Sequence, residues 1–252
     1  MIPKIIHACW FGTLPIPEEH KKYIEGWRKV MPNYEIRVWT YDDFSKELTG
    51  SYKFFEESVQ RKAWAFTSDF FRVYILKKYG GIYVDTDVEI LKPFDEFLNA
   101  HLFMSYIFDD SIGTAVIGVE PNSPIMNDWL KILQDDYEKT GEFTVSNFWV
   151  TKYFLDKVAG FKLDGKRQSL PGGIELYPKD YFERLQLKKN SGGGYCVHHC
   201  EGAWRKKTKL KAFVKKSIVT IFGKKCWERL TLLRLTKKQP YYSEYKKAKK
   251  QK

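Results

Sequence analysis

Asp85 and Asp87, separated by one threonine, are the residues of this chain whose spacing most directly suggests chemistry. Side chains two apart on an extended segment point to the same side of the chain. Two carboxylates on one side can bind a hard divalent cation such as Mn²⁺ or Mg²⁺, and that cation can bridge a diphosphate. Because Asp pairs are also common in turns, the motif gains weight only from the elements around it.

Asp69 and Arg72 lie upstream at a spacing of three, so on a helix they share one face. One interpretation is an intrahelical salt bridge worth a few tenths of a kcal/mol. The other is a pair that hydrogen-bonds sugar hydroxyls near the metal. The spacing alone favours the salt bridge.

The segment from Cys196 to Cys200 contains His198 and His199 between its two cysteines. A structural zinc site is disfavoured because no second cysteine pair follows at the usual spacing. One imidazole can instead complete the Asp-x-Asp metal site, or the two histidines can simply be packed and hydrogen-bonded. The spacing leaves these two hypotheses open.

The elements that must position these residues follow a strand and helix alternation. Residues 5–10 are a short apolar run that predicts a buried strand, and residues 34–39 predict a second strand. Between them, residues 17–30 predict a helix that begins with proline and acids. This order is typical of a parallel α/β sheet.

The acidic pair itself follows the clearest helical pattern. Apolar residues recur every three or four positions over residues 60–79, which predicts a helix with one stripe facing the core, and Gly80-Gly81 is typical of its end. Residues 82–84 then predict a strand that delivers the carboxylates at its carboxyl end, where open α/β sheets bind ligands. Further along we expect a strand at 115–119 and a helix at 124–137.

The charge is unevenly distributed. The chain has a net charge of +12, but residues 205–252 hold 18 Lys and Arg against two acidic residues, so the preceding residues have a net charge of −4. An acidic body is unsuited to a polyanion, so we expect no nucleic acid as partner. The basic tail suggests an anionic surface instead.

We therefore divide the chain into a catalytic domain, 1–204, and a basic helical tail, 205–252. Residues 210–222 place apolar side chains on one face and lysines on or beside the other, which predicts a helix in the headgroup region of an anionic membrane; the alternative is a helix packed on the body. No spanning helix, signal peptide or disulfide framework is visible. We expect a cytoplasmic protein, peripheral on the inner face of the cell membrane.

Several blocks of the sequence resemble glycosyltransferase family 32. They are residues 2–12, residues 65–87 with the Asp-x-Asp motif, residues 177–182, and residues 198–204. The resemblance covers nearly the whole catalytic body, although residues 106–165 match poorly and the tail not at all. Glucosylating clostridial toxins are similar in the same blocks.

The resemblance implies a GT-A fold, that is, a Rossmann-like α/β structure whose mixed, mostly parallel sheet is flanked by helices, here with the basic C-terminal helical tail. It also implies a nucleotide-sugar donor, Mn²⁺ or Mg²⁺, and retention of the anomeric configuration. UDP-sugar is favoured over a guanosine donor by analogy.

The same resemblance implies roles for individual residues. Asp69, Arg72, Asp85 and Asp87 are the expected catalytic residues. Asp85 and Asp87 are expected to bind the metal with His199, for which His198 is the alternative. Donor binding is expected from Trp10, which stacks on the base, together with Asp69, Arg72, Tyr83, Asp85 and Trp204. At Ala203 family members commonly carry Ser, so a hydroxyl contact at that position is not expected.

The sequence thus predicts a metal-dependent retaining hexosyltransferase. It would act on a hydroxyl of a glycan or lipid-linked oligosaccharide in bacterial capsule or O-antigen synthesis. One alternative is a metal-dependent nuclease or phosphotransferase whose tail binds nucleic acid, which requires steeply salt-dependent binding. Another is a non-catalytic membrane-associated module, which the joint presence of the candidate residues disfavours.

Overall fold

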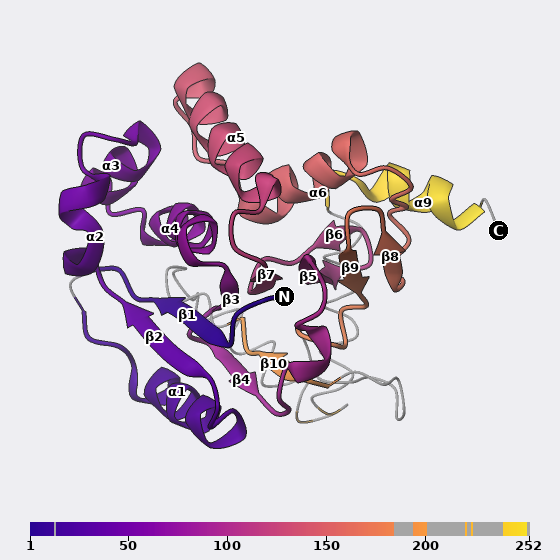
Figure 1. Cartoon of the computed structure of the whole chain (residues 1–252). Helices are drawn as coiled ribbons and strands as arrows, with labels where there is room; N and C mark the ends of the chain where they lie inside the picture. Colours follow the sequence, from indigo (N-terminus) through magenta and orange to yellow (C-terminus); the bar gives the residue numbers. More distant parts are fainter. Residues whose placement is uncertain (13, 184–193, 201–219, 221–222, 224–238, 251–252) are drawn as a thin grey trace.

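The computed structural model describes residues 1–12, 14–183, 194–200, 220, 223 and 239–250. A mixed sheet forms its centre, with the strand order β2-β1-β3-β7-β5-β9-β8 and β6 paired to β5 (Figure 1). The strands are β1 (Ile5–Cys9), β2 (Glu35–Trp39), β3 (Gly81–Val84), β5 (Leu102–Phe108), β6 (Ser111–Ile112), β7 (Val116–Val119), β8 (Gln168–Leu170) and β9 (Ile174–Tyr177).

Strand direction in this sheet confirms the predicted mixed, mostly parallel arrangement. β1 runs parallel to β2 and β3, and β5 runs parallel to β9. β7 and β8 are antiparallel to their neighbours, so the other strands of the path all point the same way. The carboxyl ends of β1, β3, β5 and β9 therefore meet at one edge of the sheet.

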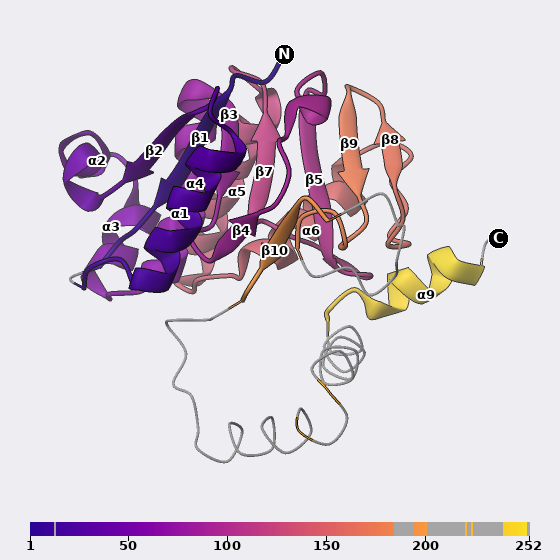
Figure 2. The ribbon, with the colours of Figure 1, turned by 90° about the horizontal axis from the view of Figure 1, so that it is seen from below.

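Both faces of the sheet are covered (Figures 1 and 2). One face carries α2 (Tyr41–Leu48), α3 (Lys53–Gln60), α4 (Trp64–Tyr79), α5 (Pro124–Thr140) and α6 (Ser146–Lys157). The other carries α1 (Glu18–Val30) and a small antiparallel sheet of β4 (Val88–Ile90) and β10 (Cys196–His198). A short 3₁₀ turn, η1, spans Asp95–Phe97. Each face has its own buried cluster, with Phe70 and Trp129 in one and Trp27 and Phe97 in the other.

The strands predicted at residues 5–10, 34–39, 82–84 and 115–119 are β1, β2, β3 and β7, and the helices predicted at 17–30 and 124–137 are α1 and α5. The single helix predicted over residues 60–79 is wrong at its beginning. α3 ends at Gln60 and α4 begins at Trp64, because Lys62 takes a left-handed φ of 52° that interrupts the helical path. No glycine or proline marks this break in the sequence.

α4 is also more buried than a single core-facing stripe predicts. Every residue from Asp69 to Leu76 is buried. The reason is that α4 packs against β1 and β3 on one side and against α3 and α5 on the other. Asp69 and Arg72 on this helix are therefore shielded from water, which strengthens their electrostatic interactions.

The turn from α4 into β3 depends on a glycine. Gly80 ends α4 with a positive φ of 63°, and its N–H donates to the Leu76 carbonyl at 2.8 Å. A Cβ on Gly80 would lie 2.6 Å from the backbone nitrogen of Pro121, so no larger residue fits. β3 can therefore begin directly after the helix, which fixes where its carboxyl end falls.

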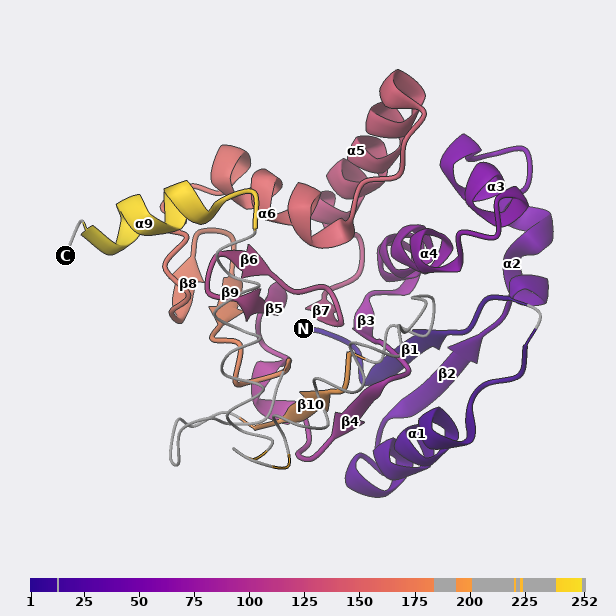
Figure 3. The same ribbon diagram turned by 180° about the vertical axis from the view of Figure 1, so that it is seen from behind.

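The last described helix, α9 (Tyr242–Lys250), lies beside α6 and packs against the body of the fold (Figure 3). Tyr245 is only 7% exposed and joins the buried cluster of the α4 face. Its hydroxyl lies 3.5 Å from Asp109, which follows β5. The amphipathic helix predicted at 210–222 falls almost wholly outside the described residues, so the boundary at residue 205 stays a prediction. Among the helices that are described, none combines the length and apolarity needed to cross a membrane.

Candidate metal centre

The acidic motif lies in a turn between β3 and β4. The Val88 N–H donates to the Asp85 carbonyl at 3.0 Å, and the Asp85 N–H donates to the Ala115 carbonyl at 2.9 Å. Thr86, buried between the two acids, is hydrogen-bonded through Oγ1 to Nδ1 of His20 in α1 at 3.0 Å. The two acids thus follow the carboxyl end of β3 as predicted, but they lie in a turn and not on the extended segment that their spacing suggested.

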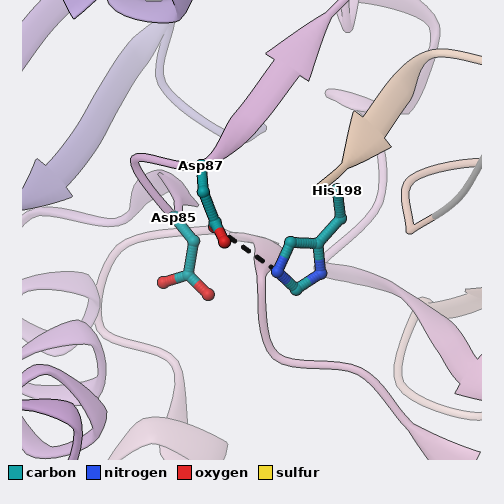
Figure 4. Close-up of side chains that lie close together, drawn as sticks. All are labelled: Asp85, Asp87 and His198. Carbon is teal, nitrogen blue, oxygen red and sulfur yellow. Dashed lines mark ion pairs between the residues drawn. The ribbon is translucent and has the colours of Figure 1, made fainter. Parts of the chain in front are cut away.

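A third side chain joins the two carboxylates. Ligand atoms of Asp85, Asp87 and His198 all lie within 4.8 Å of one another, and no other such group occurs in the part of the chain that the structure describes (Figure 4). His198 Nε2 is 3.4 Å from Asp87 Oδ1. Carboxylate oxygens suit Mn²⁺ and Mg²⁺, and an imidazole is a ligand for transition metals. The donor set therefore fits a divalent cation, with Mn²⁺ the better match to its nitrogen.

Asp85 is held by two neighbours. Its Oδ1 accepts hydrogen bonds from Arg72 Nη2 and from the Tyr83 hydroxyl, each at 3.0 Å. Burial raises the pKa of Asp85 to about 6, although Arg72 opposes the rise, and the negative charge of Asp87 adds to it. A cation placed between the two acids would relieve this repulsion.

Arg72 is the buried centre of a second cluster beside the acids. Nη1 lies 3.2 Å from Asp69 Oδ1 and donates to both the carbonyl and the hydroxyl oxygen of Thr114, at 3.0 and 2.6 Å. Its guanidinium carbon lies 4.8 Å from the ring centroid of Tyr83. The predicted Asp69–Arg72 salt bridge is thus present, but it is buried and extends to Asp85.

The two adjacent histidines point to different partners. His198 Nδ1 is 2.6 Å from Glu183 Oε2, while Nε2 faces Asp87. Burial lowers the pKa of His198, but Cys200, Glu183 and Asp87 outweigh it and raise that pKa well above its ordinary value. His199 stacks on Tyr23 at 4.7 Å and contacts Glu89 through Nε2 at 3.2 Å. The structure therefore brings the alternative, His198, to the acids, and not His199.

The remaining predicted donor-binding residues lie in different settings. Trp10 directly follows β1, is half-buried, and packs edge-on against His20 with ring centroids 5.5 Å apart. Since His20 also binds Thr86, Trp10 is connected to the acidic turn by one residue. Tyr83 is 1% exposed, so it contributes its hydroxyl to Asp85 and offers no open ring surface. Trp204 lies outside the described residues.

Sequence inspection missed several residues that support the centre: His20, Gly113, Thr114 and Glu183. Glu183 and Thr114 are far in sequence from the residues they contact, and neither stands in a spacing that signals chemistry. His20 lies on a predicted helix with no sign that it faces Thr86. Only the approach of distant segments reveals these residues.

Known proteins that are similar to this chain indicate which class of reaction the candidate centre belongs to. A family model described as a glycosyltransferase sugar-binding region containing the DXD motif matches residues 17–104. "Uncharacterized glycosyltransferase L373" of Acanthamoeba polyphaga mimivirus is 28% identical, over 83% of this chain and 86% of that protein. Inositol phosphoceramide mannosyltransferase 3 of Schizosaccharomyces pombe is 29% identical over 50% of this chain.

The match to that fission yeast protein spans only 35% of its length. Mannosyl phosphorylinositol ceramide synthase SUR1 of Saccharomyces cerevisiae is similarly matched, at 28% identity over 36% of its length. Among solved structures, the PaToxG glycosyltransferase superimposes with a TM-score of 0.53 at 21% identity, over 63% of this chain and 70% of that chain. This superposition agrees with the arrangement of sheet and helices described above.

Proposed function

Since this chain is a DXD-containing glycosyltransferase of the family 32-like type with a GT-A fold, we propose that it moves a hexosyl group from a nucleoside diphosphate sugar to a hydroxyl of a lipid-linked acceptor, with retention of configuration. The observation that carries this proposal is the convergence of Asp85, Asp87 and His198 at the carboxyl end of β3. Such a group suits the one charged product of the reaction, a nucleoside diphosphate.

Asp85, Asp87 and His198 would hold the cation, and Mn²⁺ is our first choice over Mg²⁺. When bound, the cation supplies positive charge that offsets the charge developing on the diphosphate as it leaves. The residues around it need little rearrangement, because Arg72 and Tyr83 already fix Asp85. Preorganised charge of this kind is where most transition-state stabilisation arises.

Asp69 and Arg72 would bind the donor sugar, since they form a buried pair whose arginine contacts Asp85. Trp10 would stack on the base. His20 contacts Trp10 and is hydrogen-bonded to the acidic turn, so it would hold the Trp10 ring beside that turn. Tyr83 would act by orienting Asp85, and Trp204 stays a candidate for donor binding. No side chain is assigned as a nucleophile, because a front-face displacement requires none.

The donor and acceptor are proposed from different sources. The family resemblance favours UDP-sugars, and the basic tail suggests a lipid-linked acceptor of the kind used in the assembly of bacterial capsule or O-antigen. The names of the yeast relatives instead point to mannosyl transfer onto an inositol phosphoceramide. A lipid-linked acceptor is common to both, and for that reason it is the acceptor class we propose.

The tail would bring the enzyme to such an acceptor by binding an anionic membrane surface. Within its described residues, the helix α9 carries Lys246, Lys247, Lys249 and Lys250 and is docked on the body. Lysines near a charged bilayer contribute about 1 kcal/mol each. Cosedimentation with phosphatidylserine vesicles should exceed that with neutral vesicles and fall with added salt, whereas equal binding to both contradicts the membrane role.

The proposed reaction is tested by thermal unfolding in a panel of UDP- and GDP-sugars with and without Mn²⁺. Ligands that bind the folded state raise the melting temperature, so one nucleotide class should stabilise the protein only when Mn²⁺ is present. Asp87→Ala should lose both this stabilisation and hydrolysis of the free donor while staying folded. Absence of any shift with both classes, or full activity of Asp87→Ala, would overturn the proposal.

A further inference from the structure

We propose that Glu183 is a positioning residue for the metal centre: it fixes the ring of His198 so that Nε2 faces the cation, and Gly113 provides the space that Glu183 occupies. This inference rests on the proposed function, because it assigns a support to the same centre. It concerns residues that the family motifs do not include.

Glu183 holds His198 at two points. The Glu183 side chain is 1% exposed, and its Oε2 lies 2.6 Å from Nδ1 of the ring. The main-chain carbonyl of Glu183 accepts a second hydrogen bond, from the His198 N–H, at 2.9 Å. One bond orients the imidazole and the other fixes the strand β10 that carries it.

The first of these bonds also selects which nitrogen is free. A buried carboxylate accepts, so Nδ1 carries the proton that it donates to Glu183. A cation that binds at this point displaces the proton from the other nitrogen, Nε2, which then presents its lone pair. Nε2 is the atom that lies 3.4 Å from Asp87. A carboxylate behind a metal-binding histidine is a common way to fix ring orientation and tautomer.

Gly113 is the reason that the Glu183 carboxylate fits. A Cβ at this position would lie 1.9 Å from Glu183 Oε1 and 2.7 Å from its Cδ, far inside van der Waals contact. Because the Glu183 side chain is buried, we expect it to relieve such a clash by moving its carboxylate away from His198. The Gly113 N–H bonds to the Ser105 carbonyl at 2.8 Å, and alanine would keep this bond.

The same short segment supports the other side of the centre. Thr114, the next residue, accepts two hydrogen bonds from Arg72, which in turn donates to Asp85. The connection between β6 and β7 thus governs both His198, through Gly113 and Glu183, and Asp85, through Arg72. A steric change at Gly113 should therefore reach the cation without altering any ligand.

The test is titration of the full-length protein with Mn²⁺ alone, with free Mn²⁺ followed by electron paramagnetic resonance. Loss of a partner behind a metal ligand costs about 10–100-fold in affinity, so Glu183→Leu and Gly113→Ala should each weaken binding by that factor. Glu183→Gln, which still accepts from Nδ1, should recover most of the affinity. Glu89→Gln is the matched control, because Glu89 contacts His199 and is half-exposed.

Each outcome bears on a different claim. Mn²⁺ binding by the parent protein that Asp87→Ala removes supports the metal centre, whereas no binding by the parent overturns the proposed function itself. With that binding present, unchanged affinity in Glu183→Leu or in Gly113→Ala overturns the positioning role. A loss in Glu183→Gln as large as in Glu183→Leu also overturns it, as does an equal loss in Glu89→Gln. Melting temperatures of all variants are compared, and if Glu183→Leu does not fold, the other two variants decide.

Discussion

Arg72 Nη2, on α4, donates a 3.0 Å hydrogen bond to Asp85 Oδ1, in the turn that follows β3, and this bond joins the Asp69–Arg72 pair to the candidate metal centre. The carboxylate of Asp69, on the same helix, forms an ion pair with Nη1 of the Arg72 guanidinium. The negative charges of these two carboxylates are therefore balanced by the one buried guanidinium of Arg72. The stability of the chain and the shape of its centre depend on the same side chain.

Replacing Arg72 with Met should destabilise the fold strongly. The substitution keeps the length of the side chain but leaves Asp69 and Asp85 without their counter-ion, which costs about 3–5 kcal/mol in buried pairs. Urea denaturation of the metal-free protein measures this change in the free energy of unfolding. Arg61→Met is the control, because Arg61 pairs with Glu57 at the half-exposed surface and should lose less than about 1 kcal/mol. Equal losses in the two variants would show that the Arg72 cluster is not buried as described.

The two histidines should differ in their effect on metal binding. His198→Ala removes a ligand atom of the group and should weaken Mn²⁺ binding by at least about 10-fold. His199→Ala removes a ring that contacts Tyr23 and Glu89, so Mn²⁺ affinity should change little. Calorimetric titration of both variants makes the comparison. The opposite order would restore the sequence-based choice of His199.

His7 should make the fold sensitive to mild acid. Trp39 donates to its Nδ1 at 3.1 Å and Nε2 donates to the Gly80 carbonyl at 3.0 Å, so both nitrogens are satisfied only in the neutral ring. Burial lowers the pKa of His7 to about 4 from 6.5. Between pH 6.5 and pH 4, His7 is protonated in the unfolded chain but not in the folded one. The free energy of unfolding therefore has its full value above pH 6.5 and declines as the pH falls towards 4.

The loss over that interval amounts to about 3 kcal/mol, at about 1.4 kcal/mol for each unit of pKa difference. Denaturant midpoints measured from pH 7 to pH 4 follow it. His7→Phe cannot titrate and should show a shallower decline from a lower starting stability. If the decline is equally steep in His7→Phe, other groups cause it.

The packing of α9 on the body should contribute to the free energy of unfolding. Tyr245→Ala removes an aromatic ring that is 7% exposed and should cost about 3 kcal/mol, in the range of large core truncations. Lys247→Ala, on the exposed part of the same helix, should change the free energy of unfolding by less than about 0.5 kcal/mol. Matching values for the two variants would contradict the packing of α9 on the body.

Local pattern was sufficient for the elements that carry the acidic motif. Apolar runs at 5–10 and 82–84 predicted β1 and β3, and the glycine pair marked the end of α4, because short-range backbone preferences act within a few residues. The family resemblance added the chemistry of Asp85 and Asp87. It could not show that these acids lie in a turn, since a spacing of two is compatible with turn and strand alike.

The sequence by itself determined that an α/β sheet delivers two carboxylates at a strand end, because alternation and end signals are local properties. Tertiary structure alone decided that His198 faces those carboxylates, since Glu183 and Gly113 act on it from segments far apart in the chain. It also decided that α3 and α4 are separate helices, which no glycine or proline announces. Contacts between distant segments depend on how the whole chain packs, and spacing along the chain carries no record of them.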